Sequence, residues 1–362
     1  MRTLKLDLNK RSYNIIIGAG ILGGLGRQIR RLDIGSDAYV ITNPFIRNKY
    51  GPLLDRTLTA SGFTVKFRNI PDTEKSKSME VASSVINDIT CYDKKKDIFI
   101  VAFGGGVIGD LSGFIASIYK RGIPYIQVPT TLLAQVDSAI GGKTAVDLSR
   151  GKNLVGAFYQ PRLVYSDVRV IRTLDKRQVR SGLAEIIKYG IIKDPRLFGY
   201  LEKKYRDILN LNPAALEFTV MRSSRIKALV VRQDERETKG VRTILNFGHT
   251  IGHAIEAAAG FKSYTHGEAV ALGMLVASDI SRELNLSDAA TVKRIEGLIR
   301  SAGLPTTIKG VSVGRIIKMH YRDKKFSGPE NKFVLVERIG RIKIVKNVPL
   351  EAIRRALRER TG

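Results

Sequence analysis

Apolar residues in the first half of the chain form short runs, and segments with helical spacing separate them. The runs that are typical of buried strands lie at residues 38–42, 63–67, 98–103 and 125–128. Leu4, Leu6 and Leu8 alternate with polar residues, which also indicates a strand. Helical spacing is found between the strands, at 79–89 and 107–119. Strands that alternate with helices predict a mostly parallel sheet covered by helices.

From about Thr173 onward the pattern becomes helical. Segments with helical spacing lie at residues 179–192, 213–232, 250–259, 268–284 and 290–302. The exception is 333–345, which predicts a late hairpin that turns at Gly340. We therefore expect an α/β domain over residues 1–172 and an all-α or mainly helical domain over residues 173–362.

The length of 362 residues suits two domains with sizeable cores. No run of eighteen apolar residues is present, so the sequence predicts no membrane span. The N-terminus lacks the continuous apolar segment of a signal peptide, and we expect a cytoplasmic protein. Cys91 is the only cysteine, which excludes an intrachain disulfide.

The formal net charge of +27 raises the question of a nucleic-acid partner. The basic residues are spread thinly, with modest clusters at 75–77, 322–325 and 354–360. Aromatic residues are not interleaved with these clusters, as they are in proteins that stack bases. A solvated basic surface together with a site for a small anionic substrate explains the charge better than a nucleic-acid function.

A glycine-rich turn follows the strand at 98–103 and precedes a helix. Its sequence is Gly104-Gly105-Gly106-Val107-Ile108-Gly109-Asp110. Glycines allow backbone amides to approach a phosphate closely, and the helix N-terminus favours negative charge. The Rossmann fingerprint also has an acidic residue about 20 positions later, which the stretch 125–131 lacks. The turn predicts phosphate binding without the usual ribose recognition, and a plain strand-to-helix turn is the alternative.

Three of the four histidines, His249, His253 and His266, lie close together in the sequence. On a helix, His249 and His253 would share one face, an arrangement that suits a divalent metal completed by a carboxylate. The residues alone do not decide which two histidines bind, or which carboxylate joins them.

Two further segments place polar residues among apolar ones. Glu185 and Lys188 fall three apart on a predicted helix, where they form either a surface ion pair or part of a site. Gly141-Gly142-Lys143-Thr144 and Gly151-Lys152-Asn153 suggest amides and ammonium groups around anionic oxygens, although a plain loop is possible. A Walker A loop would need glycine where Asp137 stands, which disfavours ATP.

Between about Asn69 and Gly328 the chain resembles the 3-dehydroquinate synthase family. The motifs that carry the resemblance, in family order, are FGGGVIGDLSGFIASIYKRG, QVPTTLLAQVDSAIGGKTAV, GKNLVGAFYQP, GLAEIIKYG, RTILNFGHTIGHAIE and HGEAVALGM. The resemblance implies an N-terminal nucleotide-binding α/β domain, an all-helical C-terminal domain and an active site in the cleft. It also implies NAD, one divalent metal (zinc or cobalt) and a homodimer.

The implied reaction converts 3-deoxy-D-arabino-heptulosonate 7-phosphate to 3-dehydroquinate and phosphate, in the shikimate pathway of aromatic amino acid biosynthesis. It proceeds by transient oxidation with NAD, phosphate elimination, re-reduction and an intramolecular aldol closure.

The resemblance also implies roles for individual residues. The implied metal ligands are Glu185, His249 and His266. The implied NAD contacts are Glu74, Lys77, Gly105, Gly106, Asp110, Thr130 and Thr131, with Lys143, Lys152 and Asn153 also assigned to the cofactor site. The implied substrate contacts are Asp137, Lys143, Asn153, Lys188, Lys227, Arg242, Asn246 and His253. Arg121 is expected to reach the substrate phosphate from a neighbouring subunit, and Lys324 or Lys325 to complete the anion site.

One departure from the family pattern concerns the end of the second predicted strand. The family usually has Asp-x-Asn there, whereas this chain reads Thr42-Asn43-Pro44-Phe45, so we expect altered ribose recognition.

Two groups of related enzymes are alternatives to the implied function. A metal-dependent polyol or glycerol-phosphate dehydrogenase of the same fold would lack the motifs around Lys143 and Glu185. Cyclases that act on sedoheptulose 7-phosphate or glucose 6-phosphate differ at substrate positions, where Lys227, Asn246 and His253 resemble the dehydroquinate type.

Overall fold

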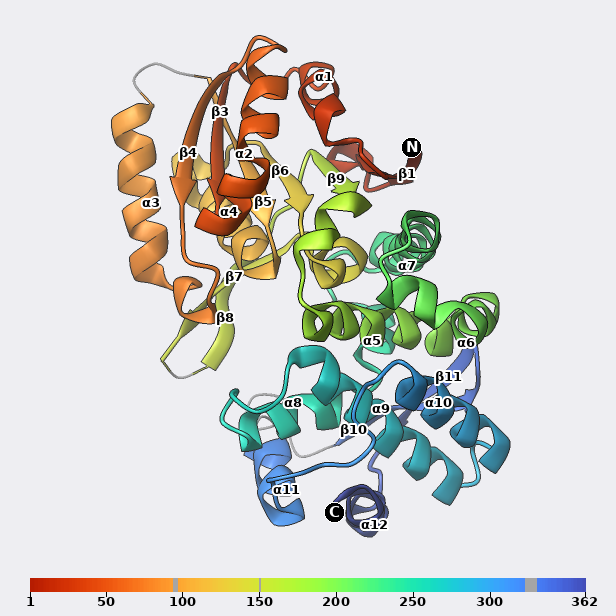
Figure 1. Ribbon diagram of the computed structural model, residues 1–362. Helices are drawn as coiled ribbons and strands as arrows, with labels where there is room; N and C mark the ends of the chain where they lie inside the picture. The colour runs from red at the N-terminus through yellow and green to blue at the C-terminus, as the bar shows by residue number, and fades with distance from the viewer. Residues whose placement is uncertain (94–96, 150, 323–330) are drawn as a thin grey trace. The chain divides into compact units, whose positions relative to one another are not determined.

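The computed structural model describes residues 1–93, 97–149, 151–322 and 331–362. The chain forms two compact units (Figure 1). The first contains Met1–Leu174 and Leu216–Arg236, and the second contains Asp175–Ala215 and Glu237–Gly362.

A seven-stranded sheet forms the centre of the first unit, in the order β1-β2-β9-β6-β5-β3-β4. The strands are β1 (Arg2–Leu6), β2 (Tyr13–Gly18), β3 (Asp37–Thr42), β4 (Thr64–Asn69), β5 (Ile98–Gly104), β6 (Tyr125–Pro129) and β9 (Leu163–Asp167). Only β1 runs antiparallel to its neighbour, and the other pairs are parallel. Parallel strands need helical crossovers, which agrees with the alternating pattern of the sequence.

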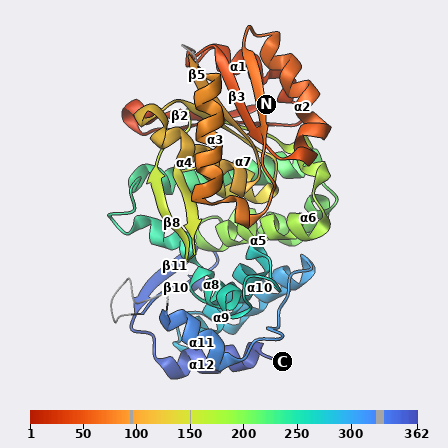
Figure 2. The same ribbon diagram turned by 90° about the vertical axis from the view of Figure 1, so that its left-hand side faces the viewer.

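Helices cover both faces of this sheet. They are α1 (Leu25–Arg30), α2 (Pro44–Thr59), α3 (Met79–Tyr92) and α4 (Gly106–Ile118). Alternate residues of β3 point to opposite faces: Val40 packs in a core with α1 and α2, and Ile41 in a core with α3 and α4. Figure 2 shows α3 in front of the strands. A separate hairpin, β7 (Lys143–Leu148) with β8 (Gly151–Phe158), also belongs to this unit.

The second unit is mainly helical. Its helices are α5 (Lys176–Ile192), α6 (Pro195–Leu209), α8 (His249–Ala258), α9 (His266–Glu283), α10 (Ala289–Ser301), α11 (Val313–Arg322) and α12 (Leu350–Arg360). Helix α9 is buried along almost all of its length and packs against α5, α8, α10 and α12. A two-stranded hairpin, β10 (Lys332–Arg338) with β11 (Arg341–Lys346), packs on α9 as well.

Glycines allow the backbones around α9 to approach one another closely. A Cβ atom on Gly273 of α9 would lie 1.9 Å from the carbonyl oxygen of Gly248, just before α8. A Cβ atom on Gly267 would lie 2.4 Å from the backbone of Ser181 in α5. Real Cβ contacts are never this short, so side chains larger than hydrogen would force α5, α8 and α9 apart.

The predicted fold class is confirmed: an α/β unit with a mostly parallel sheet is joined to a helical unit. The late hairpin turns where the sequence indicated, and Gly340 there has φ +90°. The sequence pattern did not reveal the β7–β8 hairpin, the strands β2 and β9, or the helices α1, α2, α6, α11 and α12. None of the helices in the described residues is long and apolar enough to cross a membrane.

The division expected between residues 172 and 173 differs from the structure in one respect. Most of α7 (Pro213–Gln233) belongs to the first unit, although it follows two helices of the second. Ser224 donates a hydrogen bond to the carbonyl oxygen of Gln135, and Lys227 pairs with Asp137. Helical spacing reveals an amphipathic helix, but it does not tell which core the apolar face joins.

Candidate active site

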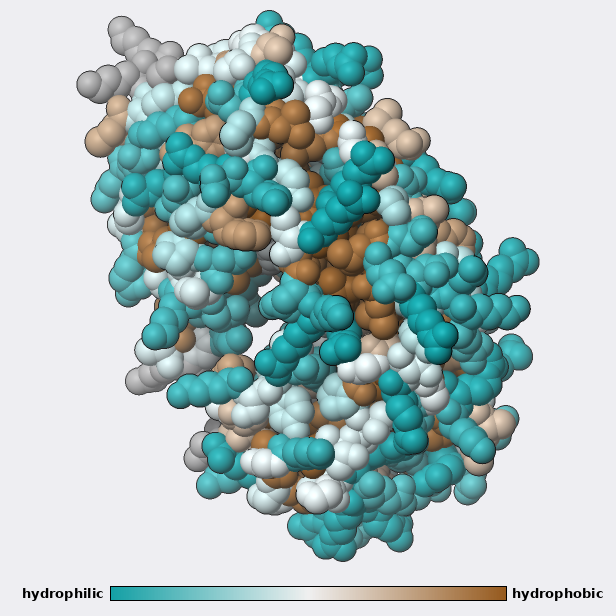
Figure 3. Space-filling model, in the orientation of Figure 1, coloured by the Kyte–Doolittle hydropathy of each residue, from teal (hydrophilic) through white to brown (hydrophobic). Residues whose placement is uncertain are grey.

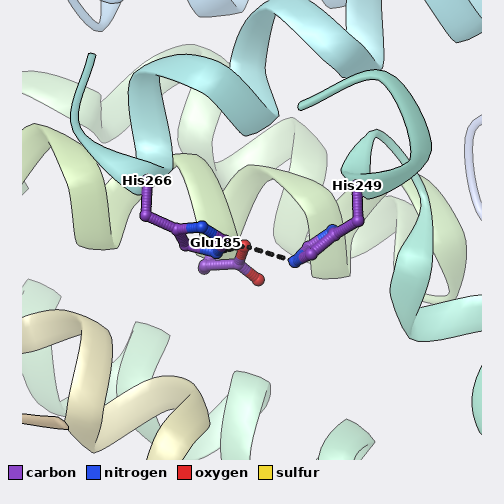
Figure 4. Close-up of side chains that lie close together, drawn as sticks. All are labelled: Glu185, His249 and His266. Carbon is purple, nitrogen blue, oxygen red and sulfur yellow. Dashed lines mark ion pairs between the residues drawn. The ribbon is translucent and has the colours of Figure 1, made fainter. Parts of the chain in front are cut away.

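Three potential metal ligands meet in the second unit. Glu185 lies in the middle of α5, His249 is the first residue of α8, and His266 is the first residue of α9. Figure 4 shows the two imidazoles pointing at the carboxylate from opposite sides. Nε2 of His249 lies 3.5 Å from Oε1 of Glu185, and Nε2 of His266 lies 3.7 Å from the same oxygen.

These separations suit a metal ion between the three side chains. Zinc bonds of about 2.0–2.2 Å in tetrahedral geometry place neighbouring ligand atoms about 3.3–3.5 Å apart. The two measured separations, 3.5 and 3.7 Å, are close to that value and longer than a normal hydrogen bond. Two imidazoles and one carboxylate also leave a fourth position for a substrate oxygen, as in catalytic zinc sites. The donor set therefore fits a divalent metal.

Glu185 is fully buried, which is costly for a carboxylate unless positive charge lies close by. Lys188, also buried, forms an ion pair with its other oxygen, Oε2. The lysine therefore holds one oxygen of the carboxylate while Oε1 faces the histidines. The sequence also allowed Glu185 and Lys188 to form an ion pair on the surface. That interpretation is wrong, because both side chains are buried.

The surroundings of the two histidines push their pKa values in opposite directions. Burial, reinforced by the positive charge of Lys188, holds the pKa of His249 well below its usual range. Burial also lowers the pKa of His266, but the nearby carboxylates of Glu185 and Glu256 outweigh it and raise the pKa to about 10. Glu256 contributes to this difference, because its carboxylate pairs with Nδ1 of His266.

His253 lies beside this group without facing Glu185. Its ring centre is 5.3 Å from that of His249 and 6.0 Å from that of His266, and the residue is exposed. It belongs instead to a second set of close ligand atoms, His253, Glu256 and His266. Same-face spacing on α8 thus brings His249 and His253 together, but only His249 has its ligand atom near the buried carboxylate.

Two other predicted substrate residues belong to the same unit. Arg242 is buried in the short helix η7 (Val241–Asn246), and Asn246 at its end is exposed. Both precede α8 directly along the chain. Their roles remain predictions.

The glycine-rich turn of the first unit joins β5 to α4 at the carboxyl edge of the parallel sheet. Gly105 is the N-cap of α4, and the amide of Thr130 donates to the carbonyl oxygen of Gly104. A Cβ atom on Gly105 would lie 3.0 Å from the side chain of Thr131. The free amides of the first turn of α4 form the kind of concave surface that binds pyrophosphate in α/β proteins. This part of the unit fits a dinucleotide.

A polar cluster around the buried ammonium group of Lys77 lies next to this turn. Lys77 is 5% exposed, and its ammonium group pairs with Asp110 at 2.6 Å and contacts the side-chain oxygen of Asn153. Burial raises the pKa of Asp110, whereas the charge of Lys77 lowers it. Nearby, Lys152 pairs with Glu74 at 3.2 Å on the surface. The structure thus brings together five residues that the sequence assigned to the cofactor.

A second pair of the first unit involves α7. Lys227 donates to Oδ1 of Asp137 at 2.6 Å and to its carbonyl oxygen at 2.8 Å. Asp137 lies in η5 (Ala134–Ser138), a π-helical turn of the kind that often marks functional sites. Lys143 begins β7 nearby in the sequence and is exposed.

The residues expected at the substrate phosphate are Arg121 and either Lys324 or Lys325. Arg121 is exposed in the turn η4 (Tyr119–Arg121), where Lys120 and Arg121 both have positive φ. Such strained conformations persist when the surroundings fix them, often at functional positions. Lys324 and Lys325 lie outside the described residues.

Comparison with known proteins decides the family. The model for the 3-dehydroquinate synthase N-terminal region matches residues 67–181, and the model for the C-terminal region matches residues 182–326. The chain is 44% identical over 349 residues to the 3-dehydroquinate synthase of Desulforamulus reducens, covering 96% of this chain and 97% of the relative. The chain belongs to the 3-dehydroquinate synthase family.

Solved structures of similar cyclases extend the comparison to the whole fold. A 2-deoxy-scyllo-inosose synthase complexed with carbaglucose-6-phosphate, NAD+ and Co2+ has a TM-score of 0.89 and 27% identity, covering 99% of this chain and 100% of that chain. A 2-epi-5-epi-valiolone synthase from Streptomyces hygroscopicus, with NAD+ and Zn2+ bound, has a TM-score of 0.88 and 26% identity, covering 98% of each chain. The resemblance inferred from the motifs is confirmed.

The departure at Thr42-Asn43 has a local structural explanation. Oδ1 of Asn43 accepts a hydrogen bond from the amide of Ile46 and so caps α2, which has Pro44 in its first turn. Nδ2 of Asn43 donates to Asp72 at 3.0 Å. A carboxylate therefore still lies at this edge of the sheet, supplied from beyond β4, and the sequence pattern gave no sign of it.

The basic cluster at 354–360 lies on α12 and is largely paired with acidic side chains. Arg360 bonds to Asp279 and Glu296, and Arg355 pairs with Glu283. Figure 3 shows hydrophilic side chains over α12, at the bottom of the view. A cluster whose charges are internally paired gives no support to a nucleic-acid partner.

Proposed function

We propose that this protein is a 3-dehydroquinate synthase, which converts 3-deoxy-D-arabino-heptulosonate 7-phosphate to 3-dehydroquinate and phosphate. The observation that carries the proposal is the meeting of Glu185, His249 and His266 around a space that suits a divalent metal, in a chain of this family. The glycine-rich turn before α4 supports NAD as the cofactor.

Each group of residues has a separate task in this proposal. When bound, the metal would acidify a secondary alcohol of the substrate, and NAD would accept and later return its hydride. Glu185, His249 and His266 would hold the metal, while Lys188 fixes the orientation of the carboxylate. The amides at the start of α4 would hold the pyrophosphate of NAD.

The substrate carries a phosphate and a carboxylate, and its charge calls for basic residues. We assign this task to Lys143, Lys188, Lys227 and Arg242, with Asp137, Asn153 and Asn246 as hydrogen-bonding partners. We assign proton transfer with the substrate to the exposed imidazole of His253, whose ring nitrogens can donate or accept a proton.

The test is the NAD requirement of phosphate release from 3-deoxy-D-arabino-heptulosonate 7-phosphate. Protein stripped of NAD should be inactive, and substoichiometric NAD should restore many turnovers without net NADH, because the hydride is returned in each cycle. Phosphate release and absorbance at the NADH band are measured together. Stoichiometric NADH from a polyol or glycerol phosphate would favour the dehydrogenase alternative. Preference for sedoheptulose 7-phosphate or glucose 6-phosphate would favour another cyclase.

We also propose that the protein is a homodimer in which Arg121 reaches the active site of the neighbouring subunit. Its place in an exposed turn with fixed, strained backbone supports this role. Arg121→Ala and His249→Ala should each be inactive alone, whereas dissociation and mixing should restore about one quarter of the wild-type activity. Half of the mixed molecules would then contain one intact site. Failure to recover activity, with dimers of mixed composition present, would contradict a role across subunits.

A further inference from the structure

The two histidines of the metal group are each held through Nδ1. Nδ1 of His249 lies 3.2 Å from the carbonyl oxygen of Phe247, two residues earlier. Nδ1 of His266 lies 3.4 Å from Oε2 of Glu256, on the neighbouring helix α8. In both cases Nε2 remains directed at Glu185. Each ligand therefore has an oxygen atom beside its Nδ1. For His249 this oxygen belongs to a neutral carbonyl, and for His266 it belongs to a carboxylate.

We propose that Glu256 is a positioning residue, which accepts a hydrogen bond from Nδ1–H of His266 and so reserves Nε2 of that ring for the metal. The inference rests on the proposed function in assuming that Glu185, His249 and His266 bind a metal. It adds a role for Glu256, the last residue of the motif RTILNFGHTIGHAIE, to which the family resemblance assigned none.

An imidazole that binds a metal is neutral and carries one proton, and the position of that proton decides which nitrogen is the ligand. A carboxylate beside Nδ1 favours the tautomer with hydrogen on Nδ1 and increases the electron density at Nε2. His266 needs such a restraint more than His249 does. Its side chain is 31% exposed, against 12% for His249, so less packing fixes the ring.

The position of Glu256 explains how the restraint is built. Glu256 lies three residues after His253 on α8, and its side chain is 12% exposed. Helix α8 packs closely on α9, whose first residue is His266. The carboxylate thus joins the start of α9 to the C-terminal end of α8. A shift of α8 or α9 would therefore change the direction in which Nε2 of His266 points.

Glu256 also belongs to the second set of close ligand atoms, with His253 and His266. An ion bound there would make Glu256 a ligand instead of a support. The first set contains the fully buried carboxylate of Glu185, which gains most from a nearby cation because water is excluded from it. We therefore assign the metal to Glu185, His249 and His266. Within the second set, we assign to Glu256 the hydrogen bond with Nδ1 of His266.

The experiment measures the affinity of the metal-free protein for Zn2+ and Co2+ by competition with a chelator. Glu256→Ala should weaken binding by about 10–100-fold, the usual effect of losing a residue that supports a ligand. Glu256→Gln should be intermediate, because an amide oxygen accepts the same hydrogen bond without the charge. Glu283→Gln, which removes a carboxylate from the far end of α9, is the matched control and should bind as the wild type does.

Three outcomes would overturn the proposal. One is wild-type affinity in Glu256→Ala, with circular dichroism and melting temperature unchanged. Another is a second equivalent of Zn2+ in the wild type that Glu256→Ala loses, which would make Glu256 a ligand. The third is a visible spectrum of the Co2+-saturated Glu256→Ala protein that shows a changed coordination number, because the proposal keeps all three ligands. Failure of the wild type itself to bind metal would instead contradict the proposed function.

Discussion

The substitutions His249→Ala and His266→Ala should each abolish metal binding, whereas the His253→Ala protein should still contain nearly one metal ion per chain. Nε2 of His249 and Nε2 of His266 both face Oε1 of the buried Glu185, whereas His253 belongs to the other set of close ligand atoms, with Glu256 and His266. Metal content is measured by mass spectrometry after gel filtration, and phosphate release is measured on the same samples.

The rate of phosphate release should fall in all three histidine variants, but for different reasons. Loss of the metal removes several kcal/mol of stabilisation, and about 4 kcal/mol corresponds to roughly a thousandfold slower reaction. His253→Ala should also react slowly, by about 100-fold or more, because a proton-transfer group is lost while the metal stays. Metal loss in His253→Ala together with metal retention in His266→Ala would show that the ligand assignment is wrong.

Gly273→Ala should strongly destabilise the second unit and weaken metal binding at the same time. The new methyl group would meet the carbonyl oxygen of Gly248 at 1.9 Å, and the amide nitrogen of Gly252 at 2.8 Å. Backbone atoms move only with their helices, so the strain should reach about 3 kcal/mol or more, the upper part of the range for overpacked cores. His249 follows Gly248 directly, so relief of the strain would displace a ligand. Denaturant unfolding and metal titration measure the two effects.

Gly297→Ala is the matched control for this substitution. Gly297 lies inside the helix α10 and is exposed, and a Cβ atom there meets nothing within 4 Å. Alanine should leave metal binding unchanged and stabilise the helix by about 0.5–1 kcal/mol. If Gly273→Ala and Gly297→Ala had the same stability and the same metal affinity, close packing of α8 and α9 would be unimportant for the site.

The sequence predicted the elements whose apolar periodicity is regular. The strands at 38–42, 98–103 and 125–128 and the helix at 79–89 match β3, β5, β6 and α3 to within a few residues. Hairpin β7–β8 was missed because β8 has no buried residue, and one of the two buried residues of β7 is the polar Thr144. Helix α2 was missed because Pro52 and several polar residues obscure its apolar face.

The site was predictable as a set of residue types but not as a geometry. Three clustered histidines indicated a metal, yet helical spacing made His249 and His253 an equally good pair. The choice between His253 and His266 depends on how α8 and α9 cross, which local sequence does not encode. Likewise, the spacing of Glu185 and Lys188 suits a surface pair, and only the packing around α5 reveals that both are buried.

The return of α7 to the first unit affects how the chain is made. A ribosome synthesises a protein from its N-terminus at about 5–20 residues per second, and domains generally fold as their last residues emerge. The first unit includes Leu216–Arg236, so it remains incomplete while the intervening segment Asp175–Ala215 is translated. Until then, Asp137 lacks Lys227, and the core beneath α7 stays open. The sheet of the first unit therefore lacks its last helix for several seconds, while the next forty or so residues, which belong to the second unit, are translated.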